Sequence, residues 1–212
     1  MRAPSSAQPA SEPSATARTA YAVNAGVAWL GVGLTAFLSG MGWYDELPVE
    51  PGLYGGHPDG AAGALARLTD TFSYFTLWSN VVVAISATLL LSRPLRGTLV
   101  RRVLRLDALL MITVTAIVYQ VLLAPTAVVT GWSQVTDPIL HVVTPAITVL
   151  VWLVWGPRGW ITGRLVPLAL TVPLLWIAWM LARGAVIDAY PYDFANVADL
   201  GYASVAQTLV GI

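Results

Sequence analysis

The stretch SYFTLWSNVVVAISATLLL, residues 73–91, decides the fold, because its second half is apolar enough to cross a membrane as a helix. Its first half is different, since four hydrogen-bonding side chains, Ser73, Thr76, Ser79 and Asn80, crowd the opening turns. Polar groups inside hydrocarbon need partners within the protein. The stretch therefore predicts a membrane span whose polar end faces other helices.

The rest of the chain has the composition of a polytopic membrane protein. Of its 212 residues, 57% are hydrophobic and 10% are charged, whereas about 25% are charged in a soluble domain. Apolar windows long enough for a span recur at 21–42, 72–92, 104–124, 138–156 and 165–182, and a sixth, cut short, lies at 197–212. We therefore predict an all-α bundle of six transmembrane spans in one domain, residues 20–212, after a disordered tail, residues 1–19.

Arginine placement predicts how this bundle sits in the membrane. Nine arginines fall on one side of the predicted spans, and only Arg67 and Arg183 fall on the other side. Positively charged segments stay in the cytoplasm, so the N-terminus should be cytoplasmic. Because all eleven basic residues are arginine, and the tail is rich in alanine, we expect a bacterial protein of the inner or plasma membrane.

Two polar stripes lie at the same predicted depth, near the outer face. Ser73, Thr76 and Asn80 follow one face of the second span. The fourth span carries a second stripe, formed by Asp137, His141, Thr144 and Thr148. Pro145 should disturb the backbone beside it, because its ring clashes with the carbonyl of His141. We expect the two stripes to face a common interior.

Other polar residues are predicted near the same outer face, namely Tyr119, Gln120, Asp193 and Asn196. Ser, Thr and Asn in membrane helices often serve only as hydrogen bonds between helices. His141 is a stronger candidate, because ionisable residues inside spans are rare and commonly functional. Asp107, toward the opposite face, is most simply an interfacial ion pair with Arg102 and Arg105.

Three segments together carry a family resemblance: YFTLWSN (74–80), PILHVVTPAITVLVW (138–152) and WIAWMLARGAVIDAYPYDFANV (176–197). In their order and spacing the chain resembles the androgen-induced-gene family of multispanning membrane proteins, and in particular its six-span bacterial branch. The resemblance implies an intramembrane hydrolase, without a cofactor, that acts on fatty acid esters of hydroxy fatty acids. It implies a threonine nucleophile at Thr76 and a histidine at His141.

The chemistry of these residues fits that implication. A threonine hydroxyl needs a neighbouring base, and neutral imidazole is the usual one. Asp137 could orient the imidazole, and the Asn80 amide is the nearest candidate donor to an oxyanion. Thr144, Tyr119, Gln120, Asp193 and Asn196 are candidate supporting residues.

Two other functions remain open on the sequence. One is a non-catalytic membrane protein that binds or carries a lipid or small molecule in the same polar site. The other is a metal-dependent hydrolase, which is disfavoured because one intramembrane histidine and no cysteine make a thin ligand set. The expected partners are membrane lipids and a fatty acyl ester substrate, and no metal or nucleic acid is expected.

Overall fold

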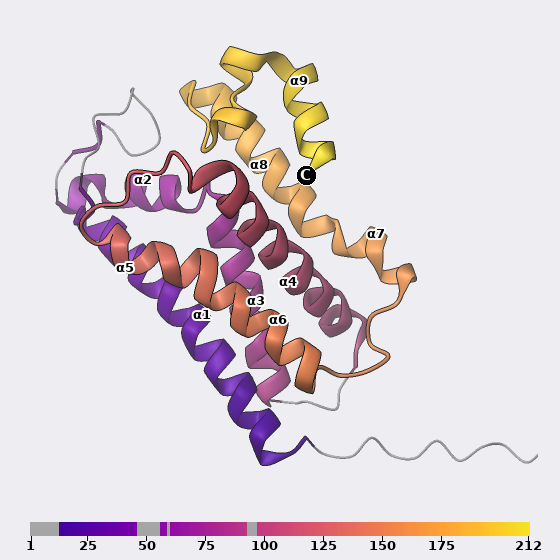
Figure 1. Cartoon of the computed structure of the whole chain (residues 1–212). Coiled ribbons are helices and arrows are strands. Elements are labelled where there is room, and N and C mark those ends of the chain that lie inside the picture. Colours follow the sequence, from indigo (N-terminus) through magenta and orange to yellow (C-terminus); the bar gives the residue numbers. More distant parts are fainter. Residues whose placement is uncertain (1–12, 46–55, 59, 93–96) are drawn as a thin grey trace, which may run out of the picture.

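The structure, a computed structural model, describes residues 13–45, 56–58, 60–92 and 97–212. This part of the chain is all-α and contains no strand (Figure 1). Its α-helices are α1 (Ala15–Met41), α2 (Ala61–Thr71), α3 (Phe75–Ser92), α4 (Leu99–Val118), α5 (Ser133–Pro138), α6 (Thr144–Trp155), α7 (Val166–Ala169), α8 (Thr171–Ile187) and α9 (Val197–Gly211). Two π-helical turns, η1 (Tyr119–Leu123) and η2 (Ile139–Val143), and two 3-10 turns, η3 (Gly163–Leu165) and η4 (Asp193–Ala195), complete it.

Five continuous helical segments in the described ranges are long and apolar enough to cross a membrane. They are Ala15–Met41, Phe75–Ser92, Leu99–Leu123, Ser133–Trp155 and Gly163–Ile187. The predicted all-α bundle is thus confirmed. The predicted sixth span forms α9, which has 15 residues and a non-helical backbone at Gly201, so it is shorter than the ~20 residues that a crossing needs.

The first helix begins earlier than the apolar pattern predicts. It starts at Ala15, and the Ser14 hydroxyl accepts a hydrogen bond from the Ala17 backbone N–H at 3.1 Å. Such a cap satisfies one of the free N–H groups at the helix start. The predicted tail is therefore helical from residue 15 onward, whereas residues 1–12 lie outside the described part of the chain.

Four of the long helices form a closed ring. Helix α1 packs against α3 and α6, and α4 packs against the same two helices. Helix α7 contacts α4 from outside the ring, and α8 continues from α7 along that side (Figure 1). Small residues, among them Ala28, Ala84 and Ala108, are fully buried and bring the helices close together.

The ring has polar groups in its interior as well as apolar ones. The Thr148 hydroxyl donates to Asn24 Oδ1 across 2.9 Å, and the Ser79 and Thr115 hydroxyls are 2.8 Å apart. Measured bonds of this kind between membrane helices average about 0.6 kcal/mol. They fix which helix faces meet.

Asp107 does not form the predicted ion pair. Asp107 and Arg105 are both buried, and within the described residues neither charged group has a hydrogen-bond partner. Arg102 donates instead to the Trp160 carbonyl at 2.7 Å. The reason is helical geometry, because Asp107 lies two residues after Arg105 and five after Arg102, whereas side chains face each other at a spacing of three or four.

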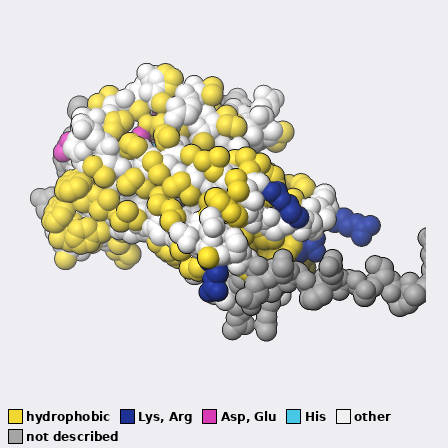
Figure 2. Space-filling model, turned by 60° about the horizontal axis from the view of Figure 1, so that its bottom comes forward, with side chains coloured by type: hydrophobic (Ala, Val, Ile, Leu, Met, Phe, Trp, Pro, Cys, Tyr) yellow, Lys and Arg dark blue, Asp and Glu magenta, His cyan; other side chains and the backbone are white. Residues whose placement is uncertain are grey.

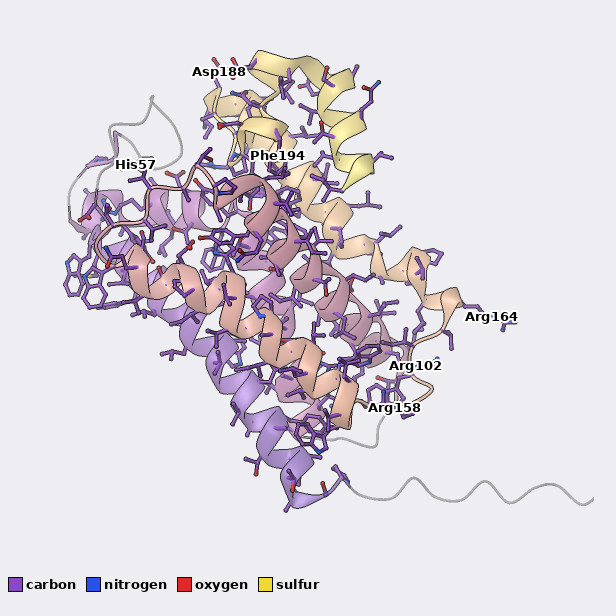
Figure 3. The ribbon with its side chains drawn as sticks, viewed as in Figure 1. His57, Arg102, Arg158, Arg164, Asp188 and Phe194 are labelled. Atoms are coloured by element: carbon purple, nitrogen blue, oxygen red, sulfur yellow. The ribbon has the colours of Figure 1, made fainter. Side chains whose placement is uncertain are left out.

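The two ends of the bundle differ in charge. Figure 3 places Arg102, Arg158 and Arg164 at one end, which we call the arginine-rich end, and His57 and Asp188 at the other end, which we call the acidic end. Figure 2 shows basic side chains gathered toward one end of a largely apolar surface. Many large apolar side chains of α6 and α8 are exposed, such as Leu150, Val154, Leu174 and Leu175, as expected of helices that face lipid.

Candidate functional site

Thr76 and His141 meet inside the bundle near its acidic end. Thr76 lies in the first turn of α3 and His141 in η2, and the Thr76 Oγ1 atom is 3.1 Å from His141 Nε2. Thr76 is only 6% exposed, and the His141 side chain is 12% exposed. The structure therefore brings together the hydroxyl and the imidazole that the two polar stripes placed at one depth.

The contacts of Asp137 determine which nitrogen atom of the His141 imidazole carries the proton. His141 Nδ1 lies 3.0 Å from the Asp137 Oδ1 atom and 3.1 Å from the Asp137 carbonyl oxygen. Both atoms are acceptors, so Nδ1 carries the proton and, in the neutral ring, Nε2 is free to accept. The Thr76 hydroxyl thus donates to Nε2, which is the arrangement that general-base activation of a hydroxyl requires.

Tyr119 holds the other side of this pair. Its hydroxyl donates to Asp137 Oδ2, and its ring stacks on the His141 imidazole with the centroids 4.0 Å apart. Tyr119 begins the π-helical turn η1, and His141 is the middle residue of η2. Such turns often occur at functional sites. The backbone disturbance expected before Pro145 thus takes the form of a π-helical turn.

Asn80 has a different role from the one that the sequence suggested. Its Nδ2 atom donates to the Thr76 carbonyl at 2.8 Å and to the Leu140 carbonyl at 3.2 Å. Both of its N–H groups are then used, so the amide is not free to bind an oxyanion. Asn80 instead ties α3 to η2, and this tie fixes the separation of Thr76 and His141.

Gly31 of α1 packs closely against η2. A Cβ atom added at Gly31 would lie 2.9 Å from Ile139 Cγ2 and 3.0 Å from Leu140 Cδ2. These contacts are closer than carbon atoms normally approach. The missing side chain of Gly31 therefore lets α1 pack directly under the residues that precede His141.

Tyr192, which was not among the predicted site residues, packs close to the start of α3. It lies between α8 and α9 and is 9% exposed. Its ring meets that of Tyr74 edge to face, with the centroids 5.6 Å apart. Burial raises the pKa of the Tyr192 hydroxyl, and the nearby Thr76 and Phe75 act in the opposite direction. The hydroxyl therefore stays protonated at neutral pH.

None of the remaining predicted residues is hydrogen-bonded to Thr76 or His141 in the described part of the chain. Gln120 and Asp193 are exposed. Asn196 caps α9, because its Oδ1 atom accepts from the Ala198 N–H at 3.0 Å. Thr144 is fully buried near η2, and its hydroxyl has no hydrogen-bond partner among the described residues.

A separate polar cluster joins helices at the acidic end of the bundle. Asp70 is 1% exposed and accepts from Arg183 of α8, and its Oδ2 atom is 2.5 Å from His57 Nε2. Arg67 donates to the carbonyls of Ser39 and Gly40 at the end of α1. These contacts join α1, α2 and α8. Among the described residues, no group of three His, Cys, Asp or Glu side chains could hold a metal ion.

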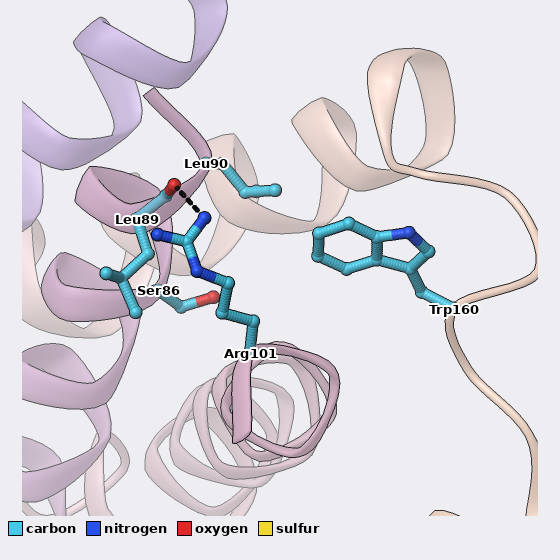
Figure 4. Close-up of a pocket in the computed structure, with 5 residues that line it drawn as sticks. All are labelled: Ser86, Leu89, Leu90, Arg101 and Trp160. Carbon is cyan, nitrogen blue, oxygen red and sulfur yellow. Dashed lines mark hydrogen bonds between the residues drawn. The ribbon is translucent and has the colours of Figure 1, made fainter. Parts of the chain in front are cut away.

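Neither of two surface hollows reaches the pair. A groove of about 420 Å³ is lined by Leu65, Leu68, Thr69, Phe72, Trp78 and Trp179, without Thr76 or His141. A hollow at the arginine-rich end, where Arg101 donates to the Leu89 carbonyl at 3.0 Å, is too small for water (Figure 4). Arg101 there satisfies a carbonyl near the end of α3, which is a structural role.

Comparisons with known proteins add no family to this description. No family model, no curated protein and no solved structure matches the chain.

Proposed function

We propose that this membrane protein hydrolyses a lipid ester, with Thr76 as nucleophile and His141 as general base. The observation that carries the proposal is the continuous contact from the Thr76 hydroxyl to His141 Nε2, and from His141 Nδ1 to the Asp137 carboxylate. A hydroxyl, an imidazole and a carboxylate in this order are the parts of a nucleophilic triad, whatever the fold that holds them.

The proposed reaction follows from the protonation described above. Thr76 Oγ1 attacks the ester carbonyl carbon, and its proton passes to His141 Nε2. The tetrahedral intermediate then collapses, and the leaving alkoxide takes that proton as an alcohol. A water molecule attacks the acyl-threonine by the same route and releases the fatty acid. Asp137 keeps the imidazole in the correct tautomer and stabilises the imidazolium that forms.

The surroundings favour a lipid substrate. The pair lies between helices that are apolar enough for a membrane, so an acyl chain could approach from the bilayer rather than from water. The resemblance of YFTLWSN and PILHVVTPAITVLVW to the androgen-induced-gene family suggests fatty acid esters of hydroxy fatty acids. We place the acidic end, with the pair, toward the outer face of a bacterial cell membrane, from the arginine distribution.

The test compares wild type with Thr76→Ala after purification to equal folded yield. Wild type should hydrolyse at least one member of a panel of long-chain acyl esters and react with an alkyl fluorophosphonate, and Thr76→Ala should do neither. Thr148→Ala is the matched control, since it removes a buried hydroxyl of α6 away from the pair. Equal behaviour of wild type and Thr76→Ala would leave the alternative, a membrane protein that binds or carries a lipid without reacting with it.

A further inference from the structure

The apolar groove between α2 and α8 lies at the depth of the candidate pair, on the other side of α3. Its volume of about 420 Å³ falls within the range of pockets that bind small molecules. Trp78, which lines the groove, follows Thr76 by two residues. The two side chains therefore leave α3 at nearly the same depth but on roughly opposite faces of the helix.

The polar groups of the groove lining are mostly bound to the lining itself. The Thr69 hydroxyl donates to the Leu65 carbonyl at 2.8 Å, and Trp78 Nε1 donates to the Phe72 carbonyl at 2.7 Å. The side chains of Leu65, Leu68 and Phe72 are hydrocarbon. A polar molecule finds few partners on such a surface, whereas an alkyl chain needs none.

The groove is open on the outside of the bundle, at membrane depth. Leu65 is 77% exposed and Trp179 is 39% exposed. Trp179 lies eight residues before Ile187, the end of α8, which is ~12 Å at the helical rise. An alkyl chain in the bilayer can thus enter sideways. Because lipid tails are as apolar as leucine, the chain gains little hydrophobic free energy by this move, and the groove selects chains by shape and packing.

The walls of the groove are fixed by polar bonds. Asp70 follows Thr69 in α2 and accepts from Arg183 of α8, so the two helices on either side of the groove are tied together. Arg67 ties α2 to the end of α1 through the Ser39 carbonyl. A chain that binds between these walls therefore needs no rearrangement of α2 or α8, which favours binding.

Phe72 connects the groove with the candidate pair. Its side chain lines the groove and also packs against the cluster of Val32, Leu77 and Leu140. Leu77 directly follows Thr76, and Leu140 directly precedes His141. Phe72 stands at the junction of α2 and α3, where a molecule that leaves the groove passes around the start of α3. Phe72 thus lies between the groove and the residues that flank the pair.

We propose that this groove binds the acyl chain of an ester substrate, and that Phe72 is the gate between the groove and Thr76. The role of Thr76 rests on the proposed function, whereas binding of an acyl chain in the groove does not. With the chain in the groove, the ester group lies near the start of α3 and reaches Thr76 when the Phe72 ring turns aside. The shape of the groove then sets which chain lengths react.

A photoreactive fatty acid tests the groove without any reaction at Thr76. The probe is palmitic acid with a diazirine at its methyl end, in phosphatidylcholine nanodiscs that contain the purified protein. We expect crosslinks in α2 and α8 that unlabelled palmitic acid removes by competition. Leu65→Trp should reduce them several-fold, because the larger side chain fills the groove. Leu150→Trp is the matched control, since Leu150 is exposed on α6 and does not line the groove.

Chain-length selectivity tests the connection to the pair. Leu65→Trp should lower kcat/KM for a palmitoyl ester several-fold more than for an acetyl ester, and Leu150→Trp should change neither. Phe72→Leu shortens the gate and keeps an apolar side chain, so an alkyl fluorophosphonate should modify Thr76 faster than in wild type. An equal or slower reaction of Phe72→Leu would overturn the gate.

The two experiments separate this inference from the proposed function. Equal crosslinking of wild type and Leu65→Trp would overturn the groove in every case, and hydrolysis by both proteins would then leave the esterase standing. Unchanged chain-length selectivity in Leu65→Trp would likewise overturn the groove as the substrate site. Competed crosslinks that Leu65→Trp removes, with no hydrolysis and no fluorophosphonate reaction in wild type, would keep the groove as an acyl-chain site and remove the esterase.

Discussion

Tyr119 and His141 lie face to face, with ring centroids 4.0 Å apart and planes inclined by 14°. The stacking fixes the rotation of the imidazole, and the Tyr119 hydroxyl holds the far oxygen of Asp137. The imidazole is therefore constrained both in its plane and along its edge. This makes Tyr119 and Asp137 positioning residues for the proposed base.

Asp137→Asn should lower kcat strongly with little change in KM. An amide can donate to His141 Nδ1 and so favour the wrong tautomer, and the equivalent change in a serine triad costs about 10⁴-fold in kcat. Tyr119→Phe keeps the stacking and loses one hydrogen bond, so a loss of about tenfold or less is expected. Steady-state kinetics on one acyl ester gives both values. A larger loss in Tyr119→Phe than in Asp137→Asn would contradict these roles.

Thr76→Ala and His141→Ala should each abolish hydrolysis, and the double variant should be no worse than either alone. Residues that share one step are strongly non-additive. Thermal unfolding in detergent should change little for Thr76→Ala, because one interhelical hydrogen bond averages about 0.6 kcal/mol. Additive losses, each leaving measurable activity, would show that the two residues act independently.

Asn80→Ala should act mainly on stability. It removes the donor that the Thr76 and Leu140 carbonyls share, although the Thr76 carbonyl keeps its bond from the Ser79 hydroxyl at 2.8 Å. The cost should be about 1 kcal/mol in the free energy of unfolding. The rate should fall by less than the ~10²-fold that removal of an oxyanion donor produces. Melting temperature and kcat, measured on the same preparation, show whether Asn80 acts on stability or on the rate. A ~10²-fold loss of rate with an unchanged melting temperature would restore Asn80 as the oxyanion donor.

Arg105→Met should leave the protein as stable as wild type or make it more stable. Arg105 is buried, and none of its side-chain nitrogen atoms has a hydrogen-bond partner among the described residues. Replacing a buried, poorly satisfied charge by an apolar side chain is often neutral or stabilising. Arg183→Met is the contrast, because it leaves the buried Asp70 carboxylate without one partner, at a cost of roughly 1–3 kcal/mol. The melting temperature of Arg183→Met should therefore fall below that of Arg105→Met. Destabilisation by Arg105→Met would indicate a partner of Arg105 such as bound water or an anion.

Gly31→Ala should slow the reaction, because its new methyl group would press on Ile139 and Leu140 and move η2. Gly33→Ala is the matched control on the same helix, since a Cβ there meets nothing within 4 Å. Both substitutions improve the intrinsic helix propensity. A loss of kcat in Gly31→Ala alone would therefore come from packing, whereas equal rates in the two variants would show that η2 tolerates the methyl group.

The sequence predicted five of the spans and the meeting of Thr76 with His141, because both follow from local periodicity. Apolar runs give the helices, and helical spacing puts Thr76 and His141 at matching depths. Roles that depend on contacts between distant segments were not predictable. Asn80 binds a backbone carbonyl of another helix, which no pattern of side chains reveals. Tyr192 lies in a segment outside the regular helices, where no periodicity indicates the direction of a side chain.

The contact of Gly31 with Ile139 and Leu140 links the candidate site to the lipid that surrounds it. Membrane helices respond to a thicker or thinner bilayer by changing their tilt. With no Cβ at Gly31, a change in the tilt of α1 is passed directly to η2, and hence to the distance between His141 and Thr76. The rate of the proposed hydrolysis should therefore depend on the acyl-chain length of the host membrane, without any effector that binds the protein.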